Sequence, residues 1–367
     1  MENLKILELF GGIGACSKAL ENLGINYEIA DYVEIDKYAV ASYNAIHNTS
    51  FEPQDITTWN KDIEVDLIMH GSPCQDFSLA GLQAGGDKDS GTRSSLMYET
   101  IRIVEKLKPK YVIWENVKNL LSKKHKHNFD AYIETMESLG YKNYYQVLNA
   151  KDYGIPQNRE RVFTISIRND IDKEFVFPEK QELKLRLKDM LEDEVDEKYY
   201  LSDKMIKYIS ADNEKWTGNN DKSLINKKIA SAINTGEGSR RCDASNYISN
   251  ECEENYNLKI KNNTKQGYLM AYPGDGVYTN TSTKRGTVQK SMIQTLTTFQ
   301  DKGVVLPDLR IRKLTPKECW RLMGFDDSDY EKASQVNSNA QLYKQAGNSI
   351  VVNVLIAILN NLIKGDK

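Results

Sequence analysis

The chain has 367 residues, of which 40% are hydrophobic and 28% charged, and its formal net charge is −3. Its length favours one large domain with a smaller companion. No long run of apolar residues predicts a membrane-spanning helix, and the chain enters a strand-like segment at once, so no signal peptide is expected. The five cysteines form no C-x-x-C pair and are odd in number, which disfavours a cysteine zinc site and a disulfide framework. A reducing cytoplasm suits this cysteine pattern best.

The acidic net charge hides one basic stretch. Residues 259–290 carry six lysines and arginines against a single acid, Asp275, which gives +5 locally. A local patch of this kind can bind nucleic acid even when the whole chain is acidic. Charge alone favours the simpler interpretation, a solvated loop surface.

Up to about residue 170, short apolar runs alternate with segments of helical spacing. Helical spacing is clearest at Leu96, Ile101, Val104 and Leu107. The strand-like runs are Leu4–Phe10, Tyr27–Val33, Asp66–His70, Tyr111–Trp114, Asn143–Leu148 and Arg161–Ile167. This alternation predicts a mostly parallel sheet with helices on both faces, and ligands bind such sheets beyond the carboxyl ends of the strands.

The pattern changes after Pro178. The charged residues 180–223 predict helix, with LKLRLKDMLEDEV as an exposed linker helix, whereas the composition of 224–305 suits short strands and long loops. A final apolar helix is expected over Ile350–Ile363, returning to the first domain. We therefore expect one domain over residues 1–180, completed by 335–367, and a second over 181–334.

A glycine-rich turn, LFGGIG, follows the first strand and opens a helix. Glycines there allow a tight turn and a close backbone approach to a ligand at the helix N-terminus. A dinucleotide fingerprint would have its third glycine where this chain has Ser17. Glu34 ends the second strand, where a carboxylate can bind ribose hydroxyls, and Asp55 could accept from an adenine amino group. These parts fit an adenosine-bearing cofactor without a pyrophosphate, although lone acids at strand ends are also common helix caps.

Three further groups adjoin predicted strands: the first two follow a strand, and the third leads into one. Cys74 lies in GSPCQ after the strand Asp66–His70, and such a thiol is either a nucleophile or an inert buried side chain. Glu115 in WENV could protonate a ring nitrogen. Arg159 and Arg161, two residues apart on an extended segment, would share a face and suit a carbonyl oxygen, a phosphate or a carboxylate, or else form a surface ladder with Glu160.

Taken together, these motifs resemble the bacterial-type C5-cytosine DNA methyltransferase family in order and spacing. The resemblance rests on FGGIG, Glu34, QDIT, GSPCQDFS, ENV, QNRERVF, RKLTPKECWRLMGF and QAGNSIVVNV. It covers the chain from Leu4 to about Leu355, apart from roughly 180–305. It implies an α/β fold with a Rossmann-like sheet that binds S-adenosylmethionine, and a smaller target-recognition domain rich in strands and loops.

The resemblance also implies a mechanism. Cys74 would add to carbon 6 of a flipped cytosine, Glu115 would contact ring N3, and Arg161 would hold the carbonyl O2. Arg159 would help to position Cys74 or nearby phosphates. The glycine-containing loop Ser78–Ser95 would close over the DNA.

The ligand contacts that the resemblance implies fall into two groups. The S-adenosylmethionine contacts are Phe10, Gly12, Gly14, Glu34, Ile35, Asp55, Ile56, Pro73, Asn348 and Ser349. The DNA contacts are Gln75, Ser78, Arg240, Arg241, Lys284, Arg285 and Thr295, the last in a short Thr-Leu element near the flipped base. No metal is implied, and the cofactor product would be S-adenosylhomocysteine.

Three rival functions stay open at this point. A tRNA cytosine-C5 methyltransferase can share the scaffold and the cysteine, ENV and arginine motifs. A nonenzymatic DNA-binding regulator can keep the fold, but the intact Cys74, Glu115 and Arg161 argue against it. A nicotinamide enzyme is disfavoured by Ser17. If the chain is a DNA methyltransferase, we expect it to bind double-stranded DNA and no membrane, and to act as a monomer in the cytoplasm. It would act alone or beside a cognate restriction endonuclease with which it forms no stable complex.

Overall fold

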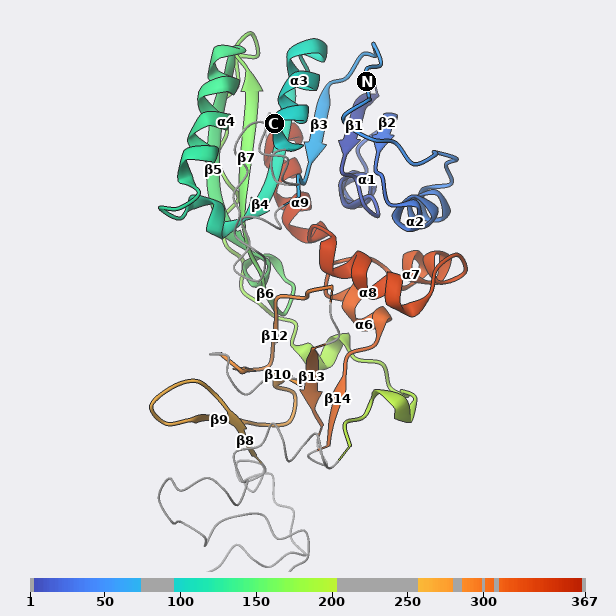
Figure 1. Ribbon diagram of the computed structural model, residues 1–367, viewed down its shortest axis with the longest axis vertical. Coiled ribbons are helices and arrows are strands. Elements are labelled where there is room, and N and C mark those ends of the chain that lie inside the picture. The colour runs from blue at the N-terminus through green and yellow to red at the C-terminus, as the bar shows by residue number, and fades with distance from the viewer. Residues whose placement is uncertain are drawn as a thin grey trace, which may run out of the picture. The chain divides into compact units, whose positions relative to one another are not determined.

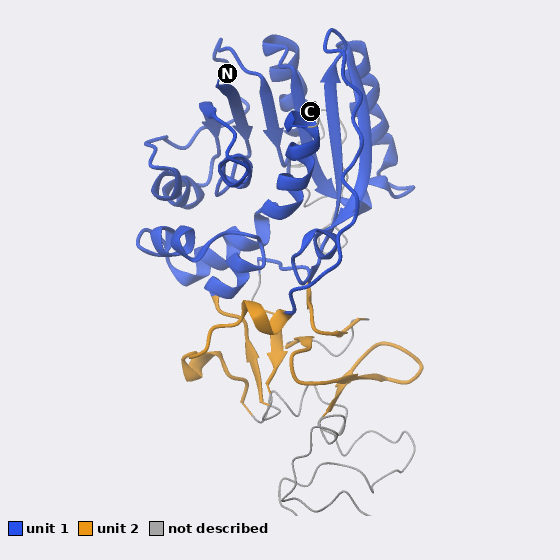
Figure 2. Cartoon of the chain, turned by 180° about the vertical axis from the view of Figure 1, so that it is seen from behind, with its two compact units in different colours: residues 1–186, 295–299, 316–367 blue, residues 187–294, 300–315 orange. Residues whose placement is uncertain are grey.

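The computed structural model of the chain consists of two compact units (Figures 1 and 2). Unit 1 contains residues 1–186, 295–299 and 316–367, and unit 2 contains 187–294 and 300–315. The structure describes residues 3–73, 96–202, 257–279, 286–298, 301–306 and 310–364.

Unit 1 is built on a six-stranded sheet in the order β2-β1-β3-β4-β7-β5. Its strands are β1 (Leu4–Leu9), β2 (Tyr27–Val33), β3 (Leu67–His70), β4 (Tyr111–Val117), β5 (Tyr141–Asn149) and β7 (Glu160–Arg168), with the two-residue strand β6 (Gln157–Asn158) just before β7. Neighbouring strands from β2 to β4 are parallel, and β7 is antiparallel to both β4 and β5. The predicted, mostly parallel α/β sheet is confirmed, and all six expected strands are present.

Helices cover both faces of this sheet. Successive side chains of β1 point to opposite faces, and from Ile6 to Leu9 both sets are buried. Leu7 and Leu9 point into a core shared with α3 and α4, whereas Glu8 points to α1 on the other face. The helices of the first part of unit 1 are α1 (Ala15–Leu23), α2 (Lys37–His47), α3 (Met97–Leu107) and α4 (Lys126–Ser138), with 3-10 turns at Lys118–Leu121 and Ala150–Tyr153.

The C-terminal part of unit 1 is helical. It contains α6 (Pro316–Arg321), α7 (Asp327–Ser334), α8 (Asn339–Asn348), α9 (Val352–Leu359) and a π-helical turn, Asn360–Lys364. The expected final helix is present and packs on α1. The stretch Asn339–Lys364 is long and apolar enough to cross a membrane, but more than half of its most apolar window is buried, as in the core helix of a folded domain.

The expected second domain, 181–334, includes residues 181–186, 295–299 and 316–334, which belong to unit 1. The longest of these segments is 316–334. Local packing places this segment in unit 1, because Trp320 of α6 is fully buried and its indole N–H donates to Leu342 O of α8 at 3.0 Å. The Trp320 ring also packs against Phe325 and Tyr330.

Unit 2 is built from short strands. An antiparallel sheet has the order β11-β10-β13-β14, and β8 and β9 form a separate antiparallel pair. The bounds are β8 (Leu258–Lys261), β9 (Tyr268–Ala271), β10 (Gly276–Tyr278), β11 (Val288–Gln289), β12 (Ile293–Gln294), β13 (Lys302–Val305) and β14 (Ile311–Lys313). Within the residues described, the expectation of short strands and long loops is confirmed.

The predicted linker helix is wrong. LKLRLKDMLEDEV contains only a 3-10 turn, Leu187–Met190, and a second 3-10 turn follows at Glu197–Tyr199. Leu187 and Met190 are buried in unit 2, and the Leu187 N–H donates to Ser291 O at 2.9 Å. Tertiary contacts thus override the helical propensity of this charged segment.

A buried carboxyl lies beneath the glycine-rich turn. Glu8 is 2% exposed and accepts hydrogen bonds from the hydroxyls of Ser17 on α1 and Tyr43 on α2. Burial raises the pKa of Glu8 to about 7. The Ser17 hydroxyl therefore satisfies a buried carboxyl of β1. This contact accounts for a serine where a dinucleotide fingerprint has glycine.

This carboxyl should make stability depend on pH. The unfolded chain releases the Glu8 proton near pH 4.5 and the folded chain near pH 7, so the folded chain binds more protons between these values. The free energy of unfolding should therefore fall as pH rises through this window, by about 3 kcal/mol in all. Glu8→Gln should lose less stability between pH 5 and pH 8 than the wild type, as measured by urea denaturation. Glu28→Gln, at an exposed position of β2, should show the same change of unfolding free energy with pH as the wild type. If Glu8→Gln also showed that change, Glu8 would not be its source.

Candidate active site

The carboxyl ends of β1, β2, β3 and β4 lie at one edge of the sheet because these strands are parallel. A predicted site segment lies at this end of each strand: the turn Phe10–Gly14 after β1, Glu34 after β2, Gly71–Pro73 after β3, and Glu115 near the end of β4. Such an edge is where α/β sheets bind ligands.

The turn after β1 is a left-handed backbone segment. Phe10, Gly12 and Gly14 have φ values of 53°, 56° and 81°. At Gly14 a Cβ atom would lie 2.2 Å from Nε2 of His47, so only glycine fits. At Gly12 a Cβ atom would meet no atom within 4 Å, so the backbone there faces open space that a ligand can approach closely.

Glu34 is anchored to this turn. One carboxylate oxygen accepts from the Gly12 N–H at 3.2 Å and the other from the Asp36 N–H at 2.9 Å, while burial raises the pKa of Glu34. Asp36 in turn forms an ion pair with Lys344 of α8 at 2.6 Å. The Ile35 side chain between the two acids is 68% exposed, which makes it an apolar surface beside a carboxylate.

The QDIT segment contains a capped turn. The Asp55 carboxylate accepts from the backbone N–H and the hydroxyl of Thr57, at 2.9 and 2.8 Å, and so caps a local turn. The Ile56 side chain is only 4% exposed and belongs to the core of unit 1. A contact of this side chain with S-adenosylmethionine, which the resemblance implies, is therefore disfavoured, because little of its surface remains accessible.

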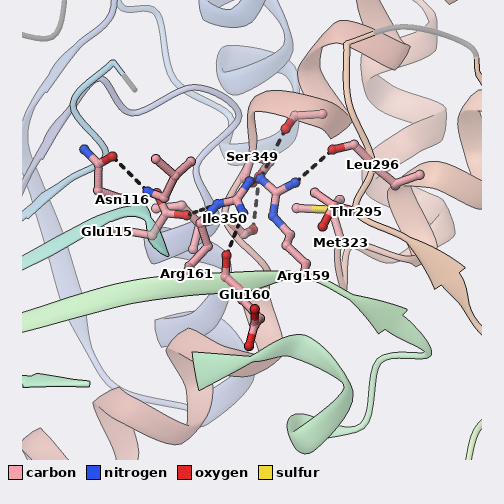
Figure 3. Close-up of polar contacts among 12 residues, drawn as sticks. Glu115, Asn116, Arg159, Glu160, Arg161, Thr295, Leu296, Met323, Ser349 and Ile350 are labelled. Atoms are coloured by element: carbon pink, nitrogen blue, oxygen red, sulfur yellow. Dashed lines mark hydrogen bonds and ion pairs between the residues drawn. The ribbon is translucent and has the colours of Figure 1, made fainter. Parts of the chain in front are cut away.

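Glu115 and Arg161 form an ion pair inside the site (Figure 3). Glu115 lies on β4 and Arg161 on the adjacent antiparallel β7, where Arg161 pairs with Val117. The Arg161 Nε lies 3.0 Å from Oε1 of Glu115, and both side chains are largely buried. Burial raises the pKa of Glu115, against the opposing effect of the Arg161 and Arg159 charges. A buried carboxyl whose pKa is raised holds its proton more tightly than an exposed one and can donate it to a base within hydrogen-bonding distance.

Arg159 makes a different set of contacts. Its guanidinium donates to the carbonyl oxygens of Leu296 at 3.1 Å, Gly347 at 3.2 Å and Ser349 at 2.8 Å (Figure 3). The side chain is 4% exposed. Arg159 thus joins two backbone segments that are far apart in the sequence, and its charge also acts on Glu115.

The Thr-Leu element is held against the same region. The Thr295 hydroxyl donates to Asn158 O at 2.7 Å, and the Leu296 N–H donates to the Gln157 side chain at 3.0 Å. Gln157 also donates to Leu322 O at 2.7 Å. No local sequence signal marks Gln157 for this role, because its partners lie more than a hundred positions away.

The two predicted residues at the end of α8 differ in exposure. Asn348 is exposed, whereas Ser349 is buried and its carbonyl oxygen accepts from Arg159. A Cβ atom on neighbouring Gly347 would lie 2.5 Å from Thr297 O, so the helix end and the Thr-Leu element require glycine there.

Several predicted residues lie outside the described residues: Cys74, Gln75, Ser78, Arg240, Arg241, Lys284, Arg285 and the loop Ser78–Ser95. Pro73, one residue before Cys74, is described and follows the buried Ser72. Among the described side chains, no group of three or more His, Cys, Asp or Glu residues could hold a metal ion.

The sequence profile of the C-5 cytosine-specific DNA methylase family matches residues 4–364. The chain belongs to this family. The methylase is 34% identical to the type II methyltransferase M2.ScrFI of Lactococcus lactis subsp. cremoris, with 98% of this chain and 99% of that protein covered. It is 33% identical to the orphan methyltransferase M.SPRI of Bacillus phage SPR, with 99% and 98% covered.

The fold also matches a solved methyltransferase structure. The crystal structure of a Spodoptera frugiperda DNMT2 mutant is similar with a TM-score of 0.61, 21% identity, and coverage of 98% of this chain and 99% of that chain. At this identity the likeness concerns the fold alone. It agrees with the α/β methyltransferase fold expected from the sequence.

Proposed function

We propose that the methylase flips a cytosine out of a specific site in double-stranded DNA and methylates its carbon 5 through a transient bond to Cys74. The observation that carries this proposal is the buried Glu115–Arg161 ion pair beside the segment that leads to Cys74. A Cβ atom on Gly71 would lie 3.7 Å from Oε2 of Glu115, so this segment passes directly over the carboxyl.

The residues at the ends of β1 and β2 fit S-adenosylmethionine. The open backbone at Gly12 would admit the amino-acid part of the cofactor, Glu34 would accept from the ribose hydroxyls, and exposed Ile35 would pack on the adenine. Phe10, Gly14, Asp55, Pro73, Asn348 and Ser349 complete the proposed contacts. When bound, the cofactor supplies an electrophilic methyl group and leaves as S-adenosylhomocysteine. No metal is needed for this chemistry.

Glu34→Gln should weaken the binding of S-adenosylmethionine. The amide offers one neutral acceptor where the carboxylate offers two charged ones, and the loss of a charge-assisted hydrogen bond should raise Kd roughly 10- to 100-fold. Calorimetric titration would measure this effect. Glu64→Gln, at an exposed position before β3, should bind like the wild type, and wild-type affinity of Glu34→Gln would rule out the ribose contact.

The proposed chemistry uses three side chains on the cytosine ring. The Cys74 thiolate adds to carbon 6 and breaks the aromaticity of the ring, which makes carbon 5 nucleophilic. Glu115 protonates N3 as negative charge develops, and Arg161 holds O2 and stabilises that charge. After carbon 5 takes the methyl group, a solvent water removes the carbon-5 proton and the Cys74 sulfur leaves carbon 6 as a thiolate. N3 returns its proton to Glu115 as the aromatic ring is restored.

We assign Arg159 a positioning role in place of direct contact with the substrate. Its guanidinium already donates to three backbone carbonyls. It therefore fixes the Thr-Leu element, which would lie near the flipped base, and the end of α8, which would lie near the cofactor.

We assign DNA recognition to unit 2. Phosphate contacts would come from the basic stretch 259–290, and base contacts from Arg240, Arg241, Lys284 and Arg285. Gln75, Ser78 and Thr295 would lie near the flipped base. Within this stretch, exposed Lys290 lies 3.8 Å from the centre of the Tyr272 ring and forms an ion pair with Asp275 at 3.3 Å.

Methyl transfer from labelled S-adenosylmethionine to unmethylated plasmid DNA and, separately, to tRNA tests the proposal. We expect label in DNA, as 5-methylcytosine at one short sequence. Preferential label in tRNA would favour the rival substrate, and DNA binding without transfer would favour the regulator. The methylase should run as a monomer in size-exclusion chromatography and act in the cytoplasm. It would act alone or beside a restriction endonuclease, since the similar proteins named above include both type II and orphan methyltransferases.

A further inference from the structure

The segment that leads to Cys74 is held by two side chains of β4. Ser72 is 4% exposed, and its hydroxyl oxygen accepts from the Trp114 indole N–H at 3.0 Å. Its carbonyl oxygen accepts from the Asn116 side-chain amide at 3.4 Å. Trp114 and Asn116 flank Glu115 in the sequence, so the strand that carries the proposed proton donor also holds the residue two positions before the proposed nucleophile.

The Trp114 ring is itself fixed in direction. It is 1% exposed and stacks on the His70 ring, with 5.7 Å between centroids and 4° between planes. The Tyr132 ring of α4 lies 4.1 Å from it, and the Tyr132 hydroxyl is hydrogen-bonded to Nε2 of His70 at 3.2 Å. Because the Trp114 ring is packed on two sides, it cannot shift to keep its hydrogen bond if Ser72 moves. Trp114 therefore fixes the position of Ser72.

The indole N–H has one acceptor in this packing, the Ser72 hydroxyl. A buried N–H without an acceptor is unfavourable. Separating Ser72 from Trp114 would therefore cost the hydrogen bond and also leave the indole N–H unsatisfied. The two residues are 42 positions apart.

We propose that Ser72 and Trp114 form a positioning pair that fixes Cys74 relative to Glu115 for attack on the base. The inference rests on the proposed function. A reacting atom displaced by about 1 Å can slow a reaction roughly 100-fold, so losing one of the two hydrogen bonds to Ser72 should slow the chemical step. It should leave the cofactor site on β1 and β2 intact.

The test measures the single-turnover rate of methyl transfer to unmethylated plasmid DNA, with saturating DNA and labelled S-adenosylmethionine. We expect Ser72→Ala and Trp114→Phe each to lower this rate about tenfold or more, with unchanged Kd for S-adenosylmethionine. Ser72→Thr keeps the hydroxyl and should stay within about threefold of the wild type. The double variant should be no slower than the slower single variant, because both changes break the same contact.

Ser166→Ala is the matched control. Ser166 is fully buried on β7 of the same sheet, pairs with Val112 away from the site, and donates to the Asn143 side chain at 2.6 Å. Its loss should lower the melting temperature without slowing methyl transfer at 25 °C. If Ser72→Ala does not fold, a lowered methyl-transfer rate in Trp114→Phe together with a near wild-type rate in Ser72→Thr still supports the positioning role of the pair.

Two results would overturn the inference alone: a wild-type rate for Trp114→Phe, or multiplied losses in the double variant, which would show independent effects. A wild-type chain that transfers no methyl group to DNA would instead overturn the proposed function, and this inference with it.

Discussion

Cys74→Ala should abolish methyl transfer while leaving the binding of S-adenosylmethionine and DNA in place. Without the sulfur, carbon 6 has no nucleophile and carbon 5 is not activated. Loss of the nucleophile of a covalent mechanism lowers kcat by roughly 10⁴-fold or more. Transfer of labelled methyl groups to plasmid DNA measures the first effect, and calorimetry with the cofactor measures the second.

The matched control for this variant is Cys319→Ala. Cys319 is buried in α6 of unit 1, so its replacement tests whether the loss of any thiol impairs the enzyme. We expect Cys319→Ala to remain active. Methylation by purified Cys74→Ala at a rate near that of the wild type would refute the covalent mechanism.

Glu115→Gln should lower the rate of the chemical step roughly 10²- to 10⁴-fold, the range typical of a lost general acid. Glutamine preserves the size of the side chain and can still hydrogen-bond to N3, but it cannot transfer a proton. Burial raises the pKa of Glu115, which favours the protonated form that this step needs. The variant also removes the ionic partner of Arg161, so the O2 contact should weaken as well.

Single-turnover kinetics at saturating DNA and cofactor isolate this effect from binding. Glu160→Gln is the control, because Glu160 is the next acid along the arginine motif but is exposed and paired with Lys118 at 3.0 Å. It should keep the wild-type rate. A loss confined to DNA affinity, with an unchanged rate at saturation, would assign Glu115 to binding and not to proton transfer.

Much of unit 1 could be predicted from the sequence because its signals are local. Apolar runs with strand length marked all six strands of the sheet, and the parallel order of four of them placed the predicted site segments at one edge. Reasoning from the sequence failed at 183–195, where the charged composition suggested a helix. There, burial of Leu187 and Met190 in unit 2 decides the conformation, and no local pattern shows that burial.

The contacts of the site could be predicted only in part. The family resemblance placed Glu115 and Arg161 on the same cytosine ring, and the two side chains form an ion pair. The partners of Arg159 lie 137 and 190 positions away, at Leu296 and Ser349, and are backbone atoms, which carry no sequence signal. Ile56 was assigned to the ligand by its motif, although its side chain belongs to the core.

The most direct test of the covalent mechanism uses DNA in which 5-fluorocytosine replaces every cytosine, so that the recognition sequence need not be known. Fluorine cannot leave carbon 5 as a proton does, so Cys74 should stay bonded to the base after methyl transfer. Incubation with S-adenosylmethionine should give a protein–DNA complex that survives denaturing electrophoresis and is absent with Cys74→Ala. If the same preparation methylates ordinary DNA and yet forms no such complex, the covalent mechanism is wrong.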